Sequence, residues 1–285
     1  MAAWVLRCAC TVLDLLDEER RETLEEDLQL RHEEILHWKE VSGTLFVPFH
    51  GDDIISQFEG YEHLDEFDWE PYREKYGETL RLDRILEAEG DDVNRYKASK
   101  QADVLMLFYL FSMDELKGLF EHMGYTFDDD VMERTIDYYM ERTAHGSTLS
   151  QVVHSWVLAR RDREKAWTFW QQALHSDIED IQGGTTPEGI HLGAMAGTVD
   201  LIQRGHTGLV MGDDALRFDP LLPEELTEVK IRIRYRGHWL TVTVMQNDFT
   251  VSLDRGPLPA VRIGYREDVV EMEQGESHTF SIEPR

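Results

Sequence analysis

The chain has 285 residues, of which 41% are hydrophobic and 10% aromatic, so it can bury a substantial core in one large or two modest domains. Its 57 acidic residues outnumber its 29 basic residues, which gives a formal net charge of -28. That balance argues against nucleic acid or an anionic membrane as partner, because both are bound by clustered positive charge.

The two cysteines and the N-terminal stretch indicate a cytoplasmic protein. Cys8 and Cys10 lie two residues apart on a predicted helix and therefore point to different faces, so we expect neither a disulfide nor a shared metal. The opening stretch MAAWVLRCACTVLDLL contains Arg7 and Asp14 and lacks a basic start, which favours an amphipathic helix over a signal peptide. No apolar run approaches the roughly 18 residues of a membrane span.

Apolar residues recur at helical spacing through the first half of the chain. The pattern predicts helices over residues 4–16 and 22–41 with a charged turn between them. Residues 45–57 are strand and loop material, 62–69 form an acidic loop, and 72–90 suit short helices. The run VLMLFYLF has no polar face, and good helix formers precede it, so we expect a fully buried helix over residues 99–111.

Further helices follow, and then the sequence period changes. Helices are predicted at 114–122, 128–141, 147–160, 164–175 and 189–203, the last containing small residues that allow close packing. Successive helical hairpins suit an α/α toroid, in which inner helices surround a central pocket. Apolar and polar residues alternate over 229–244, which predicts a β-hairpin with one wet face. We therefore expect a helical domain over residues 1–218 and a small β-sandwich over 219–285.

The stretch RTAHGSTLS, residues 142–150, interrupts two of these helices. Its hydroxyl residues Ser147 and Thr148 precede an apolar helical pattern, and such residues are good helix N-caps. A helix N-terminus with free N–H groups, a neighbouring glycine and two hydroxyls is also a site for phosphate or sulfate. From the residues alone both interpretations stay open, and simple capping is the commoner one.

Four stretches in the same order resemble glycoside hydrolase family 65, which includes maltose, trehalose and kojibiose phosphorylases and some related hydrolases. The stretches are PFHGDDIISQFEGY (48–61), KASKQADVLMLFYL (97–110), RTAHGSTLS (142–150) and GGTTPEGIHLGAMAG (183–197). They are spread over most of the first two-thirds of the chain, and the closest likeness is to uncharacterised actinobacterial members. The resemblance implies part of an (α/α)6 toroid followed by a C-terminal β-sandwich.

The resemblance also implies two sugar-binding segments. In the family, the pair that matches Lys100 and Gln101 hydrogen-bonds the glucose unit in the non-reducing subsite. The alternative is a lysine paired with one of the many acids. Phe58, Glu59 and Tyr61 resemble the acceptor-side loop, in which the two rings would stack on the second sugar. The alternative there is an aromatic anchor that pins a loop.

A phosphate site is implied for His145, Ser147, Thr148 and His191. One cationic or hydrogen-bond-donating imidazole, together with hydroxyls and backbone N–H groups, can hold a phosphate dianion beneath the anomeric carbon. Hydrolases of the family instead place a carboxylate near this position, and HGSTLS contains no acid, although Glu141 and Glu188 are near in sequence. Phosphorolysis is therefore favoured, with inorganic phosphate as co-substrate and no metal or other cofactor.

No catalytic residue is assigned. The family's general acid, a glutamate, lies on a loop just before the helix with which this chain begins, and no acid here matches its motif. The resemblance thus implies a C-terminal portion of a longer protein, with the acid upstream of Met1. The acidic pairs 52–53 and 213–214 are interpreted as solvated loop residues, since a Ca²⁺ site needs about six or more converging oxygens.

Three functions are weighed. The first is part of an inverting phosphorylase that converts an α-linked glucosyl disaccharide and phosphate into β-glucose 1-phosphate and glucose. The second is an α-glucoside hydrolase of the same family, and the third is an inactive carbohydrate-binding fragment. The sequence does not give the disaccharide linkage, and it leaves a homodimer of the full-length form open.

Overall fold

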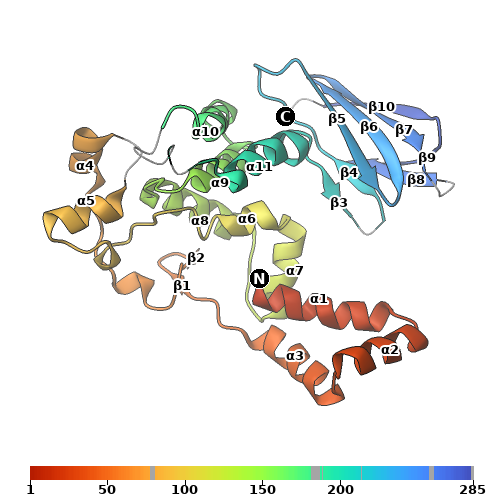
Figure 1. Cartoon of the computed structure of the whole chain (residues 1–285), viewed down its shortest axis with the longest axis horizontal. Coiled ribbons are helices and arrows are strands. Elements are labelled where there is room, and N and C mark those ends of the chain that lie inside the picture. Colours follow the sequence, from red (N-terminus) through yellow and green to blue (C-terminus); the bar gives the residue numbers. More distant parts are fainter. Residues whose placement is uncertain (78–80, 181–186, 188, 213, 257–259, 284–285) are drawn as a thin grey trace. The chain divides into compact units, whose positions relative to one another are not determined.

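A computed structural model describes residues 1–77, 81–180, 187, 189–212, 214–256 and 260–283 (Figure 1). The chain divides into two compact units. Unit 1 comprises Met1–Asp65 and Leu110–Glu141, and unit 2 comprises Glu66–Tyr109 and Arg142–Arg285. Among the described helices, none combines the length and the apolar character that a membrane crossing requires.

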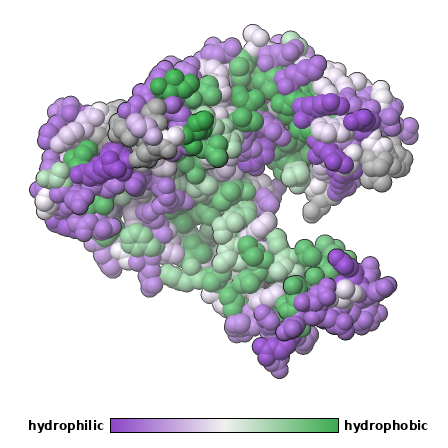
Figure 2. Space-filling view, in the orientation of Figure 1, coloured by the Kyte–Doolittle hydropathy of each residue, from purple (hydrophilic) through white to green (hydrophobic). Residues whose placement is uncertain are grey.

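Unit 1 is mainly helical. Its helices and short strands are α1 (Ala2–Leu15), α2 (Glu18–Leu28), α3 (His32–Thr44), β1 (Phe49–His50), β2 (Ile54–Ile55), the 3₁₀ turn η1 (Tyr61–His63), α7 (Met113–His122) and α8 (Asp129–Arg142). Helices α1 and α3 pack through a small core of Cys10, Leu13 and Ile35. In Figure 2 most of the visible surface is hydrophilic, and apolar patches remain over α1, where Val12 and Leu15 are exposed.

The single helix predicted over residues 22–41 is wrong, because two helices occupy this region. Asp17 accepts a hydrogen bond from the Arg20 backbone N–H at 2.8 Å, and with this cap α2 starts at Glu18, four residues earlier than predicted. Gln29 then adopts a left-handed conformation with φ 53°, which ends α2 before α3 begins. Leucines at helical spacing continue across the break, so periodicity alone did not reveal it.

The helical part of unit 2 holds both the Lys-Gln and the HGST segments. Its elements are α4 (Trp69–Tyr76), α5 (Leu82–Glu89), the 3₁₀ turn η2 (Val93–Arg95), α6 (Met106–Leu110), α9 (Thr148–Leu158), α10 (Arg163–His175), α11 (Leu192–Asp200) and the π-helical turn η4 (Leu201–His206). Of the buried helix predicted over residues 99–111, only α6 is helical. The residues before it are not helical, because their backbone groups bond to another segment, as described below.

Helices α9, α10 and α11 pack as two antiparallel pairs (Figure 1). The Ser155 hydroxyl of α9 donates to the Ala166 carbonyl of α10 at 2.9 Å, and a loop of only four residues, 159–162, joins these helices. The Trp170 indole of α10 donates to the Thr198 carbonyl of α11 at 3.1 Å. Since α9 and α11 both run against α10, they are parallel, and their N-termini lie at the same end of the trio.

Two four-stranded sheets follow the helices and share one core. Their strands are β3 (Val210–Met211), β4 (Leu216–Phe218), β5 (Glu228–Tyr235), β6 (His238–Met245), β7 (Asp248–Arg255), β8 (Ala260–Tyr265), β9 (Asp268–Glu273) and β10 (Ser277–Ser281). The sheet orders are β10-β7-β6-β5 and β3-β4-β8-β9. Buried side chains from both sheets, such as Leu240 and Ile263, pack into a single cluster.

The expected fold class is confirmed: mainly helical structure is followed by a β-sandwich. The hairpin predicted over 229–244 is β5 and β6, with Val229 opposite Val244 and Ile233 opposite Leu240. Strands β3 and β4 come before residue 219 and join the second sheet through β8. The domain boundary at 218/219 stays a prediction, since β structure starts at Val210.

Candidate functional site

The Lys-Gln segment and the HGST segment lie side by side in unit 2. The Ser99 backbone N–H donates a hydrogen bond to the Arg142 carbonyl, and the Ser99 carbonyl accepts one from the Ala144 N–H, both at 2.8 Å. The Gly146 N–H donates to the Lys100 carbonyl at 2.8 Å. These bonds form a short parallel bridge between segments more than forty residues apart in the chain. They also explain why residues 99–102 cannot begin a helix.

Ser150, the last residue of the motif, supports this joint. It is 1% exposed, and its hydroxyl accepts the Ala102 backbone N–H at 3.2 Å. A buried backbone donor without a partner costs about 1–3 kcal/mol, so this bond holds the two segments in register. Sequence reasoning missed this role, although the residue lay inside the quoted motif.

Lys100 lies at an exposed position and forms an ion pair. Its ammonium contacts Asp83 Oδ2 at 3.1 Å, and its side chain is 51% exposed. Asp83 lies in the first turn of α5 and also faces Arg81 at 3.5 Å. Burial alone would raise the pKa of Asp83, but hydrogen bonds from these two cations outweigh it and lower that pKa. Gln101 is exposed beside Lys100, so neither residue starts a buried helix as predicted.

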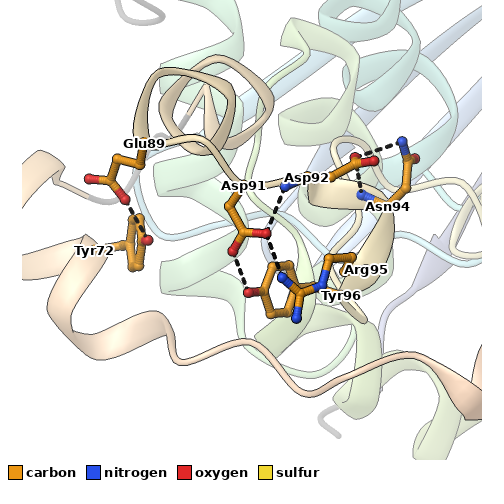
Figure 3. A network of polar contacts seen from close by, with 7 residues as sticks. All are labelled: Tyr72, Glu89, Asp91, Asp92, Asn94, Arg95 and Tyr96. Atoms are coloured by element: carbon orange, nitrogen blue, oxygen red, sulfur yellow. Dashed lines mark hydrogen bonds and ion pairs between the residues drawn. The ribbon is translucent and has the colours of Figure 1, made fainter.

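Helix α5, which carries Asp83, is tied to its neighbours by a polar network (Figure 3). The Tyr72 hydroxyl of α4 donates to Glu89 at 2.7 Å, and the Tyr96 hydroxyl donates to Asp91 at 2.6 Å. The hydrogen bond to Glu89, followed by burial, raises the pKa of Tyr72 to about 12. Beneath the network an apolar cluster includes Ala144, so the residue before His145 packs against the same elements.

Two carboxylates near the bridge each contact two cations. Glu66 contacts Lys97 at 3.0 Å and Arg142 at 3.3 Å. Burial would raise the pKa of Glu66, but hydrogen bonds and charge from these two cations lower it overall. Asp83 contacts Lys100 and Arg81 in the same way.

His145 packs in a group of three rings. Its ring centroid lies 4.4 Å from that of His154 on α9 and 5.2 Å from that of Phe169 on α10. Burial, followed by repulsion from His154 and from the cations Arg73 and Lys165, lowers the pKa of His145 to about 3. Burial likewise lowers the pKa of His154 to about 4. A pKa this far below neutral leaves the His145 imidazole uncharged at neutral pH.

Ser147 is the N-cap residue of α9, yet its side chain makes no capping hydrogen bond. The simple capping interpretation therefore does not hold for Ser147. Thr148 is the first helical residue and is 6% exposed. An uncapped N-terminus leaves the first N–H groups of α9 and the positive end of the helix dipole to an anion.

His191 is the N-cap residue of α11 and pairs with Asp177. The imidazole Nδ1 lies 2.5 Å from Asp177 Oδ1, and the His191 backbone N–H donates to Oδ2 at 2.8 Å. No sequence pattern connected these two residues, because they are 14 positions apart on either side of a glycine-rich stretch. Residues 183–186 and Glu188 of that stretch lie outside the described residues.

Helix packing brings the ends that carry Ser147 and His191 to the same level. A Cβ built on Gly197 would lie 2.6 Å from Val152, so α11 and α9 touch there. Val152 is five residues beyond Ser147, and Gly197 is six beyond His191. At about 1.5 Å per residue, both helix starts are roughly 8–9 Å along the axes from this contact. His145, Ser147, Thr148 and His191 therefore belong to one end of the trio.

Phe58, Glu59 and Tyr61 belong to unit 1. Tyr61 is 1% exposed and packs against His50 and Tyr139, with ring centroids 5.2 and 6.0 Å away. Its surroundings are those of an aromatic anchor. Phe58 is 48% exposed and meets Tyr61 edge-on, so of these two rings Phe58 is the one accessible to a ligand. Glu59 is exposed as well.

No group of three or more metal-ligating side chains occurs within the described part of the chain. The pair Asp52-Asp53 lies in the exposed turn between β1 and β2. Asp213 of the second pair is outside the described residues. Cys8 and Cys10 are both free thiols.

Helical hairpins followed by a β-sandwich, with the Lys-Gln segment beside the uncapped N-terminus of α9, define a mainly helical domain with a C-terminal β domain. Sequence comparison identifies the family: the chain belongs to glycosyl hydrolase family 65. Residues 1–200 match the central catalytic domain of that family, and residues 209–273 match its C-terminal domain. The predicted resemblance is thereby confirmed.

Individual relatives agree with this membership. A glycosyl hydrolase of Mycobacterium tuberculosis, itself uncharacterised, is 49% identical over 99% of this chain and 21% of its own length. Trehalose 6-phosphate phosphorylase of Lactococcus lactis is 31% identical over 86% of this chain and 31% of its own. A solved structure of a candidate kojibiose phosphorylase from the human microbiome superposes with a TM-score of 0.71 at 20% identity, over 98% of this chain and 39% of that one. The chain thus spans between a fifth and a third of these curated relatives.

Proposed function

We propose that this chain forms the glucose-binding and phosphate-binding part of an inverting α-glucosyl disaccharide phosphorylase. The observation that carries the proposal is the uncapped N-terminus of α9 at Ser147, at the same end of the helix trio as His191. Relatives named as trehalose 6-phosphate, kojibiose and trehalose phosphorylases support this class of reaction.

In the proposed reaction a phosphate oxygen attacks the anomeric carbon from the face opposite the leaving sugar. The bond from that carbon to the glycosidic oxygen breaks as the new bond to phosphate forms, so the α-linkage becomes β-glucose 1-phosphate. The leaving oxygen takes a proton from a general acid, for which we assign no residue here. The disaccharide linkage is left open.

Each binding residue has a role in this proposal that follows from its chemistry. Lys100 keeps two N–H donors beyond its bond to Asp83, and with the exposed Gln101 amide it would bind neighbouring glucose hydroxyls. Ser147, Thr148 and the first N–H groups of α9 would bind phosphate, and neutral His145 would donate one hydrogen bond. His191 would contact the phosphate through Nε2 from the start of α11.

The test is the phosphate dependence of disaccharide loss. The protein expressed from its full gene is incubated with trehalose, trehalose 6-phosphate, kojibiose and maltose, with and without phosphate, and glucose 1-phosphate is measured. The proposal expects loss of one disaccharide only with phosphate, and formation of the β-anomer. Equal loss without phosphate would make the protein an α-glucoside hydrolase, and binding without turnover would make it a carbohydrate-binding protein.

A further inference from the structure

Asp177 is placed to act on His191 rather than on a substrate. Its side chain is 9% exposed, whereas that of His191 is 29% exposed, so the carboxylate lies behind the ring. Its two oxygens take separate donors from one residue: the backbone N–H at 2.8 Å and the ring at 2.5 Å. Two bonds to the same N-cap residue fix both the start of α11 and the plane of its imidazole.

The charge state of Asp177 decides which ring nitrogen faces a ligand. Burial alone would raise the pKa of Asp177, but the hydrogen bonds from the His191 ring and backbone outweigh it and lower that pKa. Near neutral pH the carboxylate is ionised and can only accept hydrogen bonds, so Nδ1 must be the donor. Nε2 then remains for a ligand, and it has no hydrogen-bond partner among the residues that the structure describes.

We propose that Asp177 is a positioning residue that holds His191 with Nε2 presented to the phosphate at the shared end of α9 and α11. The inference rests on the proposed function. With its proton on Nδ1 held by the carboxylate, the ring presents an unprotonated Nε2, which can accept a hydrogen bond from the P–OH group of hydrogen phosphate. Sequence reasoning assigned His191 to phosphate but gave it no partner.

The neighbouring pair of His175 and Glu179 offers a matched control. It also joins an imidazole to a carboxylate, at 3.3 Å, but its side chains are 45% and 61% exposed. Exposed pairs of this kind contribute little, because solvent screens them. Glu179→Gln therefore removes a carboxylate from the same stretch of chain without touching the end of α11.

The experiment compares Asp177→Asn, Asp177→Glu and Glu179→Gln with the wild-type chain. Inorganic phosphate is titrated calorimetrically, glucose is titrated in parallel, and the protonated ring nitrogen of His191 is identified by long-range ¹H–¹⁵N NMR. Circular dichroism establishes that each variant is folded.

The wild type should show a proton on Nδ1, and Asp177→Asn should lose that preference and bind phosphate roughly 10–100-fold more weakly, as expected for a bond to a charged group. Its glucose affinity should stay within about twofold, Asp177→Glu should recover part of the phosphate affinity, and Glu179→Gln should match the wild type.

Two negative results have separate meanings. If the wild-type chain takes up phosphate and Asp177→Asn binds it equally well, the role of Asp177 is overturned while the phosphate site stands. If the wild-type chain binds no phosphate, both this inference and the proposed function fail. An equal loss of glucose and phosphate affinity in Asp177→Asn would indicate a general structural role and would also overturn the inference.

Discussion

At the scale of single residues, the candidate phosphate site combines imidazoles in two different electrostatic settings. His145 sits against His154 in a buried group, where burial lowers their pKa values to about 3 and about 4. His191 instead lies beside the ionised carboxylate of Asp177. One ring is thus uncharged at physiological pH because it is buried, and the other is oriented by a hydrogen bond to a carboxylate.

The buried histidines predict a pH dependence of stability. Above pH 6.5, His154 is neutral in both the folded and the unfolded chain, so it adds no pH dependence to the free energy of unfolding. Below that value the unfolded chain takes up a proton that the folded chain refuses until about pH 4, so the free energy of unfolding falls as the pH falls. Each such group contributes a slope of up to about 1.4 kcal/mol per pH unit.

His154→Gln removes one of these groups. Urea unfolding between pH 7 and pH 5 should show a shallower fall in the free energy of unfolding than in the wild type, whatever the variant's stability at pH 7. Parallel pH profiles for the two proteins would contradict the buried, neutral state of His154.

Alanine substitutions of the two aromatic residues of the acceptor-like loop should lower the free energy of unfolding by different amounts. Tyr61 is 1% exposed, so Tyr61→Ala should cost about 3–5 kcal/mol of unfolding free energy. Phe58 is 48% exposed and has one edge-on ring contact, so Phe58→Ala should cost about 1 kcal/mol. Denaturant unfolding of both variants measures this, and equal losses would show that Phe58 is also an anchor.

At the scale of elements, the site depends on how closely α9 and α11 approach. Gly197 permits that approach, because any Cβ there would overlap Val152. The small residues in this helix were predicted to allow close packing, and Gly197 confirms it. Gly193 in the same helix has nothing within 4 Å of a Cβ, so it has no such role.

Gly197→Ala should therefore destabilise the chain by about 1–3 kcal/mol through overpacking. Gly193→Ala is the matched control and should be neutral or stabilise by up to about 1 kcal/mol, since alanine favours helix. Trimming the neighbour in Gly197→Ala/Val152→Ala should make the combined loss smaller than the sum of the single losses. Chemical denaturation of the wild type, the three single variants Gly197→Ala, Gly193→Ala and Val152→Ala, and the double variant tests this. A neutral Gly197→Ala would contradict the close contact.

Sequence reasoning worked best where a local pattern determines a local structure. Helices α7 to α10 and the hairpin β5–β6 start and end within a few residues of their predicted bounds, because each has its own apolar period. The prediction of a helix over 99–111 was wrong, because its first residues form hydrogen bonds to residues 142–146 in place of hydrogen bonds within a helix. The break at Gln29 was not predicted, because a single left-handed residue leaves no periodic signal in the sequence.

The candidate site shows the same difference between local sequence patterns and tertiary contacts. The HGST and Lys-Gln segments are contiguous motifs, so a family resemblance could point to them directly. Their partners could not be found in this way, because Asp83 is 17 residues from Lys100 and Asp177 is 14 from His191. Which of many acids reaches a given cation is decided by helix packing. In a chain with 57 acids, sequence alone offers too many choices.

At the scale of the whole molecule, the proposed phosphate site is contained in unit 2. His145, Ser147, Thr148 and His191 all belong to it, so the phosphate proposal is independent of unit 1. The chain carries a formal charge of -28, which repels anions at long range. In the proposed site, attraction for phosphate would therefore have to come from local hydrogen-bond donors at the start of α9 rather than from the overall field.

The most direct measurement is a titration of this chain with inorganic phosphate, followed residue by residue in ¹H–¹⁵N NMR spectra. The account predicts saturable shifts concentrated at Gly146–Ser150 and His191–Gly193, with the β-sandwich unchanged. Absence of saturation, or shifts confined to other parts of the chain, would contradict it.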